Sequence, residues 1–218
     1  MRIVFVSQGL LQAFGEGDFY EDADVVLFGF NGVGCVNYEK ELKGESNFFE
    51  EGAKLSKRHK NLVIFGCVTD IRGLKRKSVV VAENGRLLGV SDMLHAIDGE
   101  CTAGANVKAY ETKAGKMGVV VARDLYFPET MKTLALCGCE WIVCPFDKRI
   151  SGLDRSYISV YAHVYGLPIL LCGDNFSMIA SPKGELVFSS PLSPVAVDYA
   201  ERREYHLVET RTLRHPLE

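Results

Sequence analysis

Short apolar runs separated by turn residues recur along the whole chain, and they predict an alternation of strands and helices. Runs rich in β-branched residues are typical of strands buried on both faces. The predicted strands cover residues 2–7, 24–28, 62–68, 110–112, 118–122, 141–144, 169–172 and 204–210. Apolar residues at helical spacing predict helices instead. The predicted helices cover residues 8–14, 38–60, 131–139 and 154–165.

Turn residues add two hairpins to this alternation. Asn84-Gly85 stands between two apolar runs, which is the strongest local signal for a hairpin. The segment 181–184 predicts a second hairpin of the same kind. We expect the helix over 154–165 to be capped by Ser151 or Asp154, because both side chains accept hydrogen bonds from backbone N–H groups. Strands that alternate with helices, with hairpins inserted, favour an α/β layered domain.

Composition narrows the class of protein. With 218 residues, the chain is long enough for a large core, and we predict a single domain over 1–218. A net charge of -3 gives no sign of nucleic-acid binding, and no apolar run is long enough to span a bilayer. The chain begins directly with a strand, so we expect no signal peptide. Its seven cysteines fall mostly in apolar segments, which favours a cytoplasmic protein.

The segment 116–147 holds the most informative pattern. The apolar run that begins at Gly118 is broken by Asp124, and Phe127-Pro128-Glu129 follows. Proline suits the first position of a helix, and a glutamate there suits the positive end of the helix dipole. The pattern therefore predicts a strand, a sharp elbow and a helix.

This pattern resembles the nucleophile elbow of the nitrilase, or carbon–nitrogen hydrolase, superfamily. The elbow of that family has a glycine, three apolar residues, the nucleophilic cysteine, one residue, an aspartate and then Phe-Pro-Glu. The matching positions are Gly118, 119–121, Asp124, Phe127, Pro128, Glu129, Leu134, Ala135, Gly138 and Pro145. The resemblance extends over nearly the whole chain and is densest over 85–184. It implies a four-layer α-β-β-α sandwich and a homodimer.

The same resemblance locates the catalytic triad of the family. There a cysteine attacks the amide or nitrile carbon, a glutamate acts as base, and a lysine stabilises the oxyanion. The matching positions here are Ala122 for the cysteine, Gly29 for the glutamate and Met93 for the lysine. None of these side chains can do the corresponding task. We therefore expect a catalytically inactive protein, with no cofactor, that binds a small molecule or has a regulatory role.

Two other functions stay open at this point. The chain could hydrolyse amide-type carbon–nitrogen bonds with displaced residues, and Cys144 is then the leading nucleophile because it ends the strand next to the elbow. The alternative is that Cys144 is a buried core cysteine with no role in catalysis. The chain could also be a purely structural subunit beside an active paralogue.

Some further residues could contact a ligand. We name Arg123, Cys144, Arg149 and Arg155 as pocket-binding candidates, because they follow the nucleophile position or flank the loop after Cys144. A metal site is not expected, since Cys137 and Cys139 on one helix direct their thiols apart. The basic cluster of 72–77 is interpreted as a solvated hairpin edge.

Overall fold

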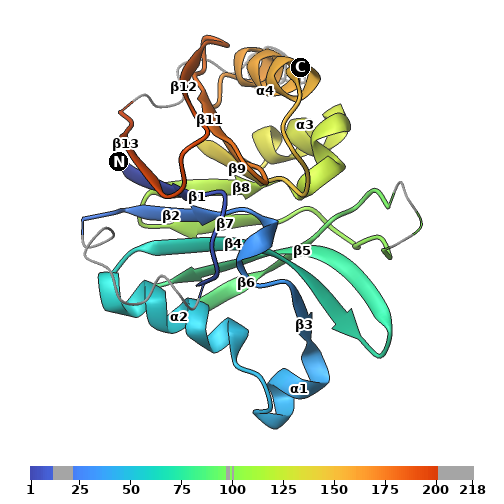
Figure 1. Ribbon diagram of the computed structural model, residues 1–218. Helices are drawn as coiled ribbons and strands as arrows, with labels where there is room; N and C mark the ends of the chain where they lie inside the picture. Colours follow the sequence, from blue (N-terminus) through green and yellow to red (C-terminus); the bar gives the residue numbers. More distant parts are fainter. Residues whose placement is uncertain (12–21, 97–98, 100, 201–218) are drawn as a thin grey trace, which may run out of the picture.

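Two β sheets pack face to face in the computed structural model, which describes residues 1–11, 22–96, 99 and 101–200 (Figure 1). The first sheet has the order β13 (Val195–Asp198), β1 (Arg2–Val6), β2 (Val25–Phe28), β4 (Leu62–Ile71), β5 (Leu74–Glu83) and β6 (Arg86–Asp92), and β3 (Cys35–Asn37) also pairs with β4. The second sheet has the order β12 (Leu186–Ser190), β11 (Ser177–Ala180), β10 (Ile169–Cys172), β9 (Trp141–Pro145), β8 (Gly115–Val119) and β7 (Ala109–Thr112).

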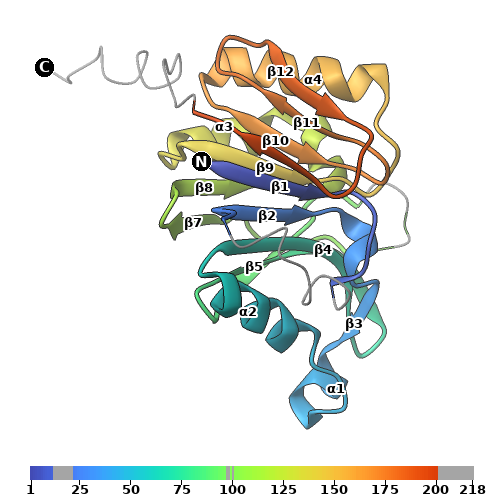
Figure 2. The same cartoon turned by 60° about the vertical axis from the view of Figure 1, so that its left-hand side comes forward.

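Helices lie on the two outer faces of the paired sheets. The helices are α1 (Tyr38–Lys43), α2 (Phe48–His59), α3 (Pro128–Leu136) and α4 (Gly152–Tyr165). Figure 2 shows α2 against the first sheet, and α3 and α4 against the second. The predicted four-layer α-β-β-α sandwich is therefore confirmed. No helix in the described part of the chain is long and apolar enough to cross a membrane.

Apolar side chains fill all three interfaces between the layers. Phe5, Leu27 and Val143 belong to the core between the sheets, while Ile158 and Leu171 belong to the core between α4 and the second sheet. All five are fully buried. Burying one such side chain contributes about 1.5–3 kcal/mol, so these interfaces dominate the free energy of folding.

The central strands of both sheets run parallel and fix the two ends of the sandwich. In the first sheet β1, β2 and β4 are parallel, and in the second β8, β9 and β10 are parallel. The ends of β2 and β10 meet, because a Cβ added at Gly29 would lie 3.1 Å from the carbonyl oxygen of Gly173. The carboxyl ends of the parallel strands therefore lie at one end of the molecule, where functional residues gather in such folds.

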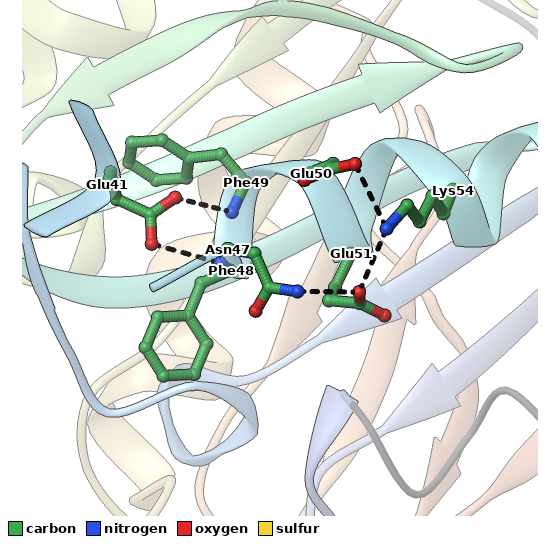
Figure 3. Close-up of polar contacts among 7 residues, drawn as sticks. All are labelled: Glu41, Asn47, Phe48, Phe49, Glu50, Glu51 and Lys54. Carbon is green, nitrogen blue, oxygen red and sulfur yellow. Dashed lines mark hydrogen bonds and ion pairs between the residues drawn. The ribbon is translucent and has the colours of Figure 1, made fainter. Parts of the chain in front are cut away.

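The predicted helix over 38–60 is two helices. Gly44 adopts a left-handed φ of 72° and ends α1, which a residue without a Cβ does at low cost. The carboxylate of Glu41 then accepts hydrogen bonds from the backbone N–H groups of Phe48 and Phe49, at 3.0 and 3.2 Å (Figure 3). A side chain of α1 thus caps α2, whose own first flanking residue, Asn47, makes no such bond.

Other differences from the predicted elements are local. Strands β3 and β13 were not predicted, and neither was the 3-10 helix at Phe30–Gly32. Ser151, one of the two predicted caps, is the N-cap of α4 and forms a capping box with Asp154. The predicted strand over 204–210 and residues 12–14 of the predicted helix over 8–14 lie outside the described residues, and the described residues 8–11 form no α-helix.

Replacing Glu41 should weaken the junction between α1 and α2. We expect Glu41→Ala to lower the free energy of unfolding by about 1–2 kcal/mol, because it removes the acceptors for two helix-terminal N–H groups. Urea denaturation followed by circular dichroism measures this loss. Glu45→Ala is the matched control, since Glu45 is an exposed glutamate in the same connection. Equal losses in the two variants would show that the cap contributes nothing.

Candidate functional site

The elbow between β8 and α3 contains a buried residue in an unusual backbone conformation. Ala122 is fully buried and has a φ of 49°, a left-handed conformation that costs a residue with a Cβ about 1 kcal/mol or more. The strand was predicted to extend to Ala122, but β8 ends at Val119 and Ala122 opens a 3-10 helix, Ala122–Tyr126. A strained strand-to-helix turn of this kind presents the nucleophile in several hydrolase folds.

A buried carboxylate, Asp124, ties the elbow to the segment that follows β6. It is 2% exposed and accepts hydrogen bonds from the backbone N–H groups of Leu94 and His95 at 2.8 and 2.9 Å. The Nδ1 atom of His95 lies 2.8 Å from the same carboxylate, and its ring stacks on Phe127. Burial raises the pKa of Asp124, while these hydrogen bonds act in the opposite direction.

The three positions matched to the triad lie at the same end of the sandwich. Met93 is buried in the same inter-sheet core as Ala122, one residue before the segment that Asp124 holds. Gly29 directly follows β2, and an added Cβ would approach backbone oxygens of Cys172 and Gly173 at 3.6 and 3.1 Å. The sequence prediction therefore selected three residues that the fold brings to one region.

A buried group of charges lies beside the elbow; the sequence analysis named Arg123 but missed Lys77 and Asp147. Lys77 Nζ is 2.6 Å from Asp147 Oδ2, and an Arg123 guanidinium nitrogen is 3.6 Å from the same oxygen. The side chains of Lys77, Asp147 and Arg123 are only 10%, 7% and 12% exposed. The second oxygen of Asp147 has no hydrogen-bond partner among the described residues.

The interpretation of 72–77 as a solvated hairpin edge is therefore wrong for Lys77. Alternation along β5 carried the signal, because Lys77 shares its strand face with Val79 and Val81, which lie in the inter-sheet core. Arg76, on the opposite face, pairs with Asp92 at 3.7 Å. Burying a lysine requires a paired carboxylate, and Asp147 supplies it.

The thiol of Cys144 lies under the elbow but is sealed from solvent. It is fully buried on β9 and donates a weak hydrogen bond to the carbonyl oxygen of Ala122, at 3.8 Å. Burial raises the pKa of Cys144 well above 9, and the nearby carboxylates Asp124, Asp147 and Asp154 raise it further. The group is therefore a neutral thiol at physiological pH, which is a weak nucleophile.

The other two predicted ligand contacts, Arg149 and Arg155, lie on the loop after β9 and on α4. The Arg149 guanidinium is 3.1 Å from the side-chain oxygen of Asn175 in the amide orientation that satisfies both groups. Arg155 stacks over the ring of Phe176, 4.7 Å from its centroid. Both arginines therefore contact the connection between β10 and β11.

The described residues were also considered as ligands of a metal ion. No group of three or more His, Cys, Asp or Glu side chains there is arranged to hold an ion. Cys137 is exposed and Cys139 is buried, and both follow the last residue of α3, Leu136, rather than lying on one helix as predicted.

A cavity of about 630 Å³ lies elsewhere, at the amino ends of the parallel strands. Asn61, Trp141 and Pro168 are among its lining residues, and each directly precedes or begins a strand. None of the predicted contacts Arg123, Cys144, Arg149 and Arg155 lines it.

The carboxylate of Asp124 should matter for stability more than any exposed acid near it. We expect Asp124→Asn to lower the free energy of unfolding by about 2 kcal/mol, because a carboxamide has one acceptor oxygen and turns its NH₂ group toward N–H donors. Denaturant titration measures the change. Glu129→Gln is the control, since Glu129 is 62% exposed and should change stability by less than about 0.5 kcal/mol. An unchanged free energy of unfolding in Asp124→Asn would contradict the proposed stabilising role of the Asp124 hydrogen bonds.

Comparison with known proteins provides independent evidence on the fold of this chain. No family model matches the chain. A Schizosaccharomyces pombe protein named a probable nitrilase is 29% identical over 112 residues, which are 47% of this chain and 40% of that protein. The matched part is thus less than half of that relative.

Solved structures match over much more of the chain. Saccharomyces cerevisiae Nit3, a member of branch 10 of the nitrilase superfamily, has a TM-score of 0.75 and 17% identity, and the match covers 100% of this chain and 94% of that one. A mutant amidase from Nesterenkonia sp. AN1, with acrylamide added to its active site cysteine, has a TM-score of 0.77, 14% identity and coverage of 98% and 97%. The chain therefore has the fold of these nitrilase-superfamily structures.

Proposed function

We propose that this protein uses the nitrilase-superfamily fold without the cysteine chemistry of that superfamily, and that it acts by binding a small molecule or as a regulatory protein. The observation that carries the proposal is Ala122. The elbow keeps its strained turn, but the side chain that it presents is a buried methyl group. A methyl group has no lone pair to attack an amide or nitrile carbon.

The two partner positions support the same conclusion. Met93 offers a buried thioether where an oxyanion would need a positive charge or a hydrogen-bond donor. Gly29 has no side chain, and a Cβ there would lie 3.1 Å from the oxygen of Gly173, closer than most Cβ contacts. A carboxylate base at Gly29 would therefore require the connection after β10 to shift.

A working hydrolase with displaced residues is the second candidate, and one observation favours it. The Cys144 thiol touches the carbonyl oxygen of Ala122, so it lies directly under the elbow. The amidase of Nesterenkonia sp. AN1 has an active site cysteine on the same fold. For Cys144 to serve in that way, the elbow would have to open, and a base would have to offset the raised pKa of the thiol.

Amide turnover separates the two candidates. We expect the wild-type protein to release no ammonia above buffer from butyramide, acrylamide or butyronitrile, because loss of the nucleophile alone removes on the order of a million-fold in turnover. If ammonia is released, Cys144→Ala and Cys172→Ala decide its source, since both thiols are fully buried at the ends of neighbouring strands. Activity lost in Cys144→Ala alone would establish the second candidate and overturn the first.

Thiol labelling tests the state of Cys144 without any substrate. We expect iodoacetamide to modify the exposed Cys35 and Cys137 in the folded protein and to spare Cys144, because a buried neutral thiol reacts slowly. Peptide mass spectrometry measures the modification, and Cys172 is the internal control because burial raises its pKa to about 12. Rapid labelling of Cys144 with Cys172 unmodified would indicate an accessible thiolate and speak for the hydrolase.

The homodimer and the cytoplasmic location stay predictions. One feature supports self-association of the chain. Large apolar side chains on α3 and α4 are exposed to solvent, namely Leu136, Leu153 and Val160.

A further inference from the structure

Four tyrosines form a continuous row between the elbow and α4. Tyr126 ends the 3-10 helix of the elbow, and Tyr157, Tyr161 and Tyr165 follow at intervals of four residues on α4, which places them on one face of that helix. Successive ring centroids along the row are 5.4, 5.6 and 6.1 Å apart. Aromatic rings whose centroids lie about 4.5–7 Å apart are in contact, so the tyrosine row has no gap.

The tyrosine at the elbow end of the row is hydrogen-bonded to a buried carboxylate. The Tyr126 hydroxyl donates to Asp154 Oδ1 at 2.7 Å, and Asp154 is only 2% exposed. The other oxygen, Asp154 Oδ2, accepts hydrogen bonds from the backbone N–H and the hydroxyl of Ser151, both at 2.7 Å. An ionised aspartate only accepts hydrogen bonds, and these three donors all point at it. Asp154 is therefore a proton acceptor in direct contact with the phenol.

The members of the row are neutral phenols that differ in their partners. Burial raises the pKa of Tyr126, and its hydrogen bond to Asp154 raises that pKa further. Burial also raises the pKa of Tyr161 to about 12. Tyr165 donates to a backbone carbonyl oxygen, that of Pro128, at 3.3 Å. Among these four residues, Tyr126 thus has the hydrogen-bonded base.

A base in this position changes how easily a phenol is oxidised. A neutral phenol that loses an electron becomes a strong acid and gives up its proton. A hydrogen-bonded base that takes the proton in the same step lowers the barrier to this oxidation. Electron transfer slows steeply with distance, so rings in contact exchange electrons rapidly. An oxidising equivalent that enters the tyrosine row should therefore move to Tyr126.

From this arrangement we propose that the tyrosine row is a one-electron relay, and that Tyr126 is the residue on which an oxidising equivalent comes to rest. A radical of the one-electron oxidant class takes an electron from Tyr157, whose side chain is half-buried. An electron from Tyr126 then restores Tyr157. The O–H bond of Tyr126 breaks, and its proton forms an O–H bond with Asp154 Oδ1. The products are a neutral Tyr126 radical, a protonated Asp154 and the reduced oxidant.

Photochemical oxidation of the full chain tests the resting site. Tris(bipyridine)ruthenium(II) with persulfate supplies the one-electron oxidant under a light flash, and electron paramagnetic resonance of rapidly frozen samples records tyrosyl radicals. We expect a tyrosyl signal that decays about tenfold faster in Tyr126→Phe, the effect of losing one charge-assisted hydrogen bond. Tyr110→Phe is the matched control and should leave the signal unchanged. Tyr110 is also buried, but its hydroxyl is hydrogen-bonded to that of Ser91, at 2.8 Å, instead of to a carboxylate.

Two further variants test the relay and the proton acceptor. Tyr157→Phe keeps an aromatic ring but replaces a phenol by a ring that is much harder to oxidise, so we expect the rapid phase of radical formation at Tyr126 to be lost. Asp154→Asn removes the base. Its radical yield should then rise with pH, because solvent must take the proton, whereas the wild-type yield should not depend on pH. A purely structural role of Asp154 would not produce this difference.

Three outcomes would overturn the proposal. The first is a wild-type protein without a tyrosyl signal, and the second is a signal whose lifetime is unchanged in Tyr126→Phe. The third is radical formation as fast in Tyr157→Phe as in the wild type, since the oxidant would then reach Tyr126 directly. If Tyr126→Phe does not fold, the Tyr157→Phe rate and the Asp154→Asn pH profile decide. None of these outcomes bears on the proposed loss of hydrolytic chemistry at Ala122.

Discussion

The face-to-face packing of the two sheets is the constraint on which the rest of the structure depends. Their facing surfaces are closed by apolar side chains such as Phe5, Leu27 and Val143, and helices cover the outer surfaces. A strand that is buried on both faces is apolar along its length. Polar residues that could bind a ligand or react therefore lie at the two ends of such strands. The carboxyl end of the sandwich holds the elbow and its charges, and the amino end holds the cavity.

Asp124 joins two segments that are not paired with each other in either sheet. Its carboxylate joins the turn after β8 to the residues after β6, and the His95 ring completes the contact on Phe127. These contacts hold the shape of the elbow with an alanine at position 122. Asp124 and Pro128 are needed to shape the turn and start α3, whatever side chain stands at Ala122. A motif built from such residues therefore identifies a fold better than a reaction.

Local patterns in the sequence were sufficient for most of the fold. Asn84 and Gly85 both adopt positive φ in the tight hairpin that the pair predicts, and Ser151 caps α4. Strands β3 and β13 escaped prediction because three or four residues carry too little periodicity, and their pairing partners lie far away in sequence. The long predicted helix failed at Gly44, where a left-handed residue overrode an otherwise helical pattern.

The candidate sites were harder to predict, for a different reason. Gly29, Met93 and Ala122 could be chosen because a resemblance pointed to them, but the Lys77–Asp147 pair joins residues seventy positions apart, and nothing local marks Asp147. The strand β9 carries Trp141 at its first position and Cys144 three residues later, about 10 Å away. Residues an odd number of positions apart point to opposite faces of a strand, so Trp141 packs in the core between the two sheets and Cys144 packs in the core that α3 and α4 cover. A single strand of five residues therefore joins two separate cores.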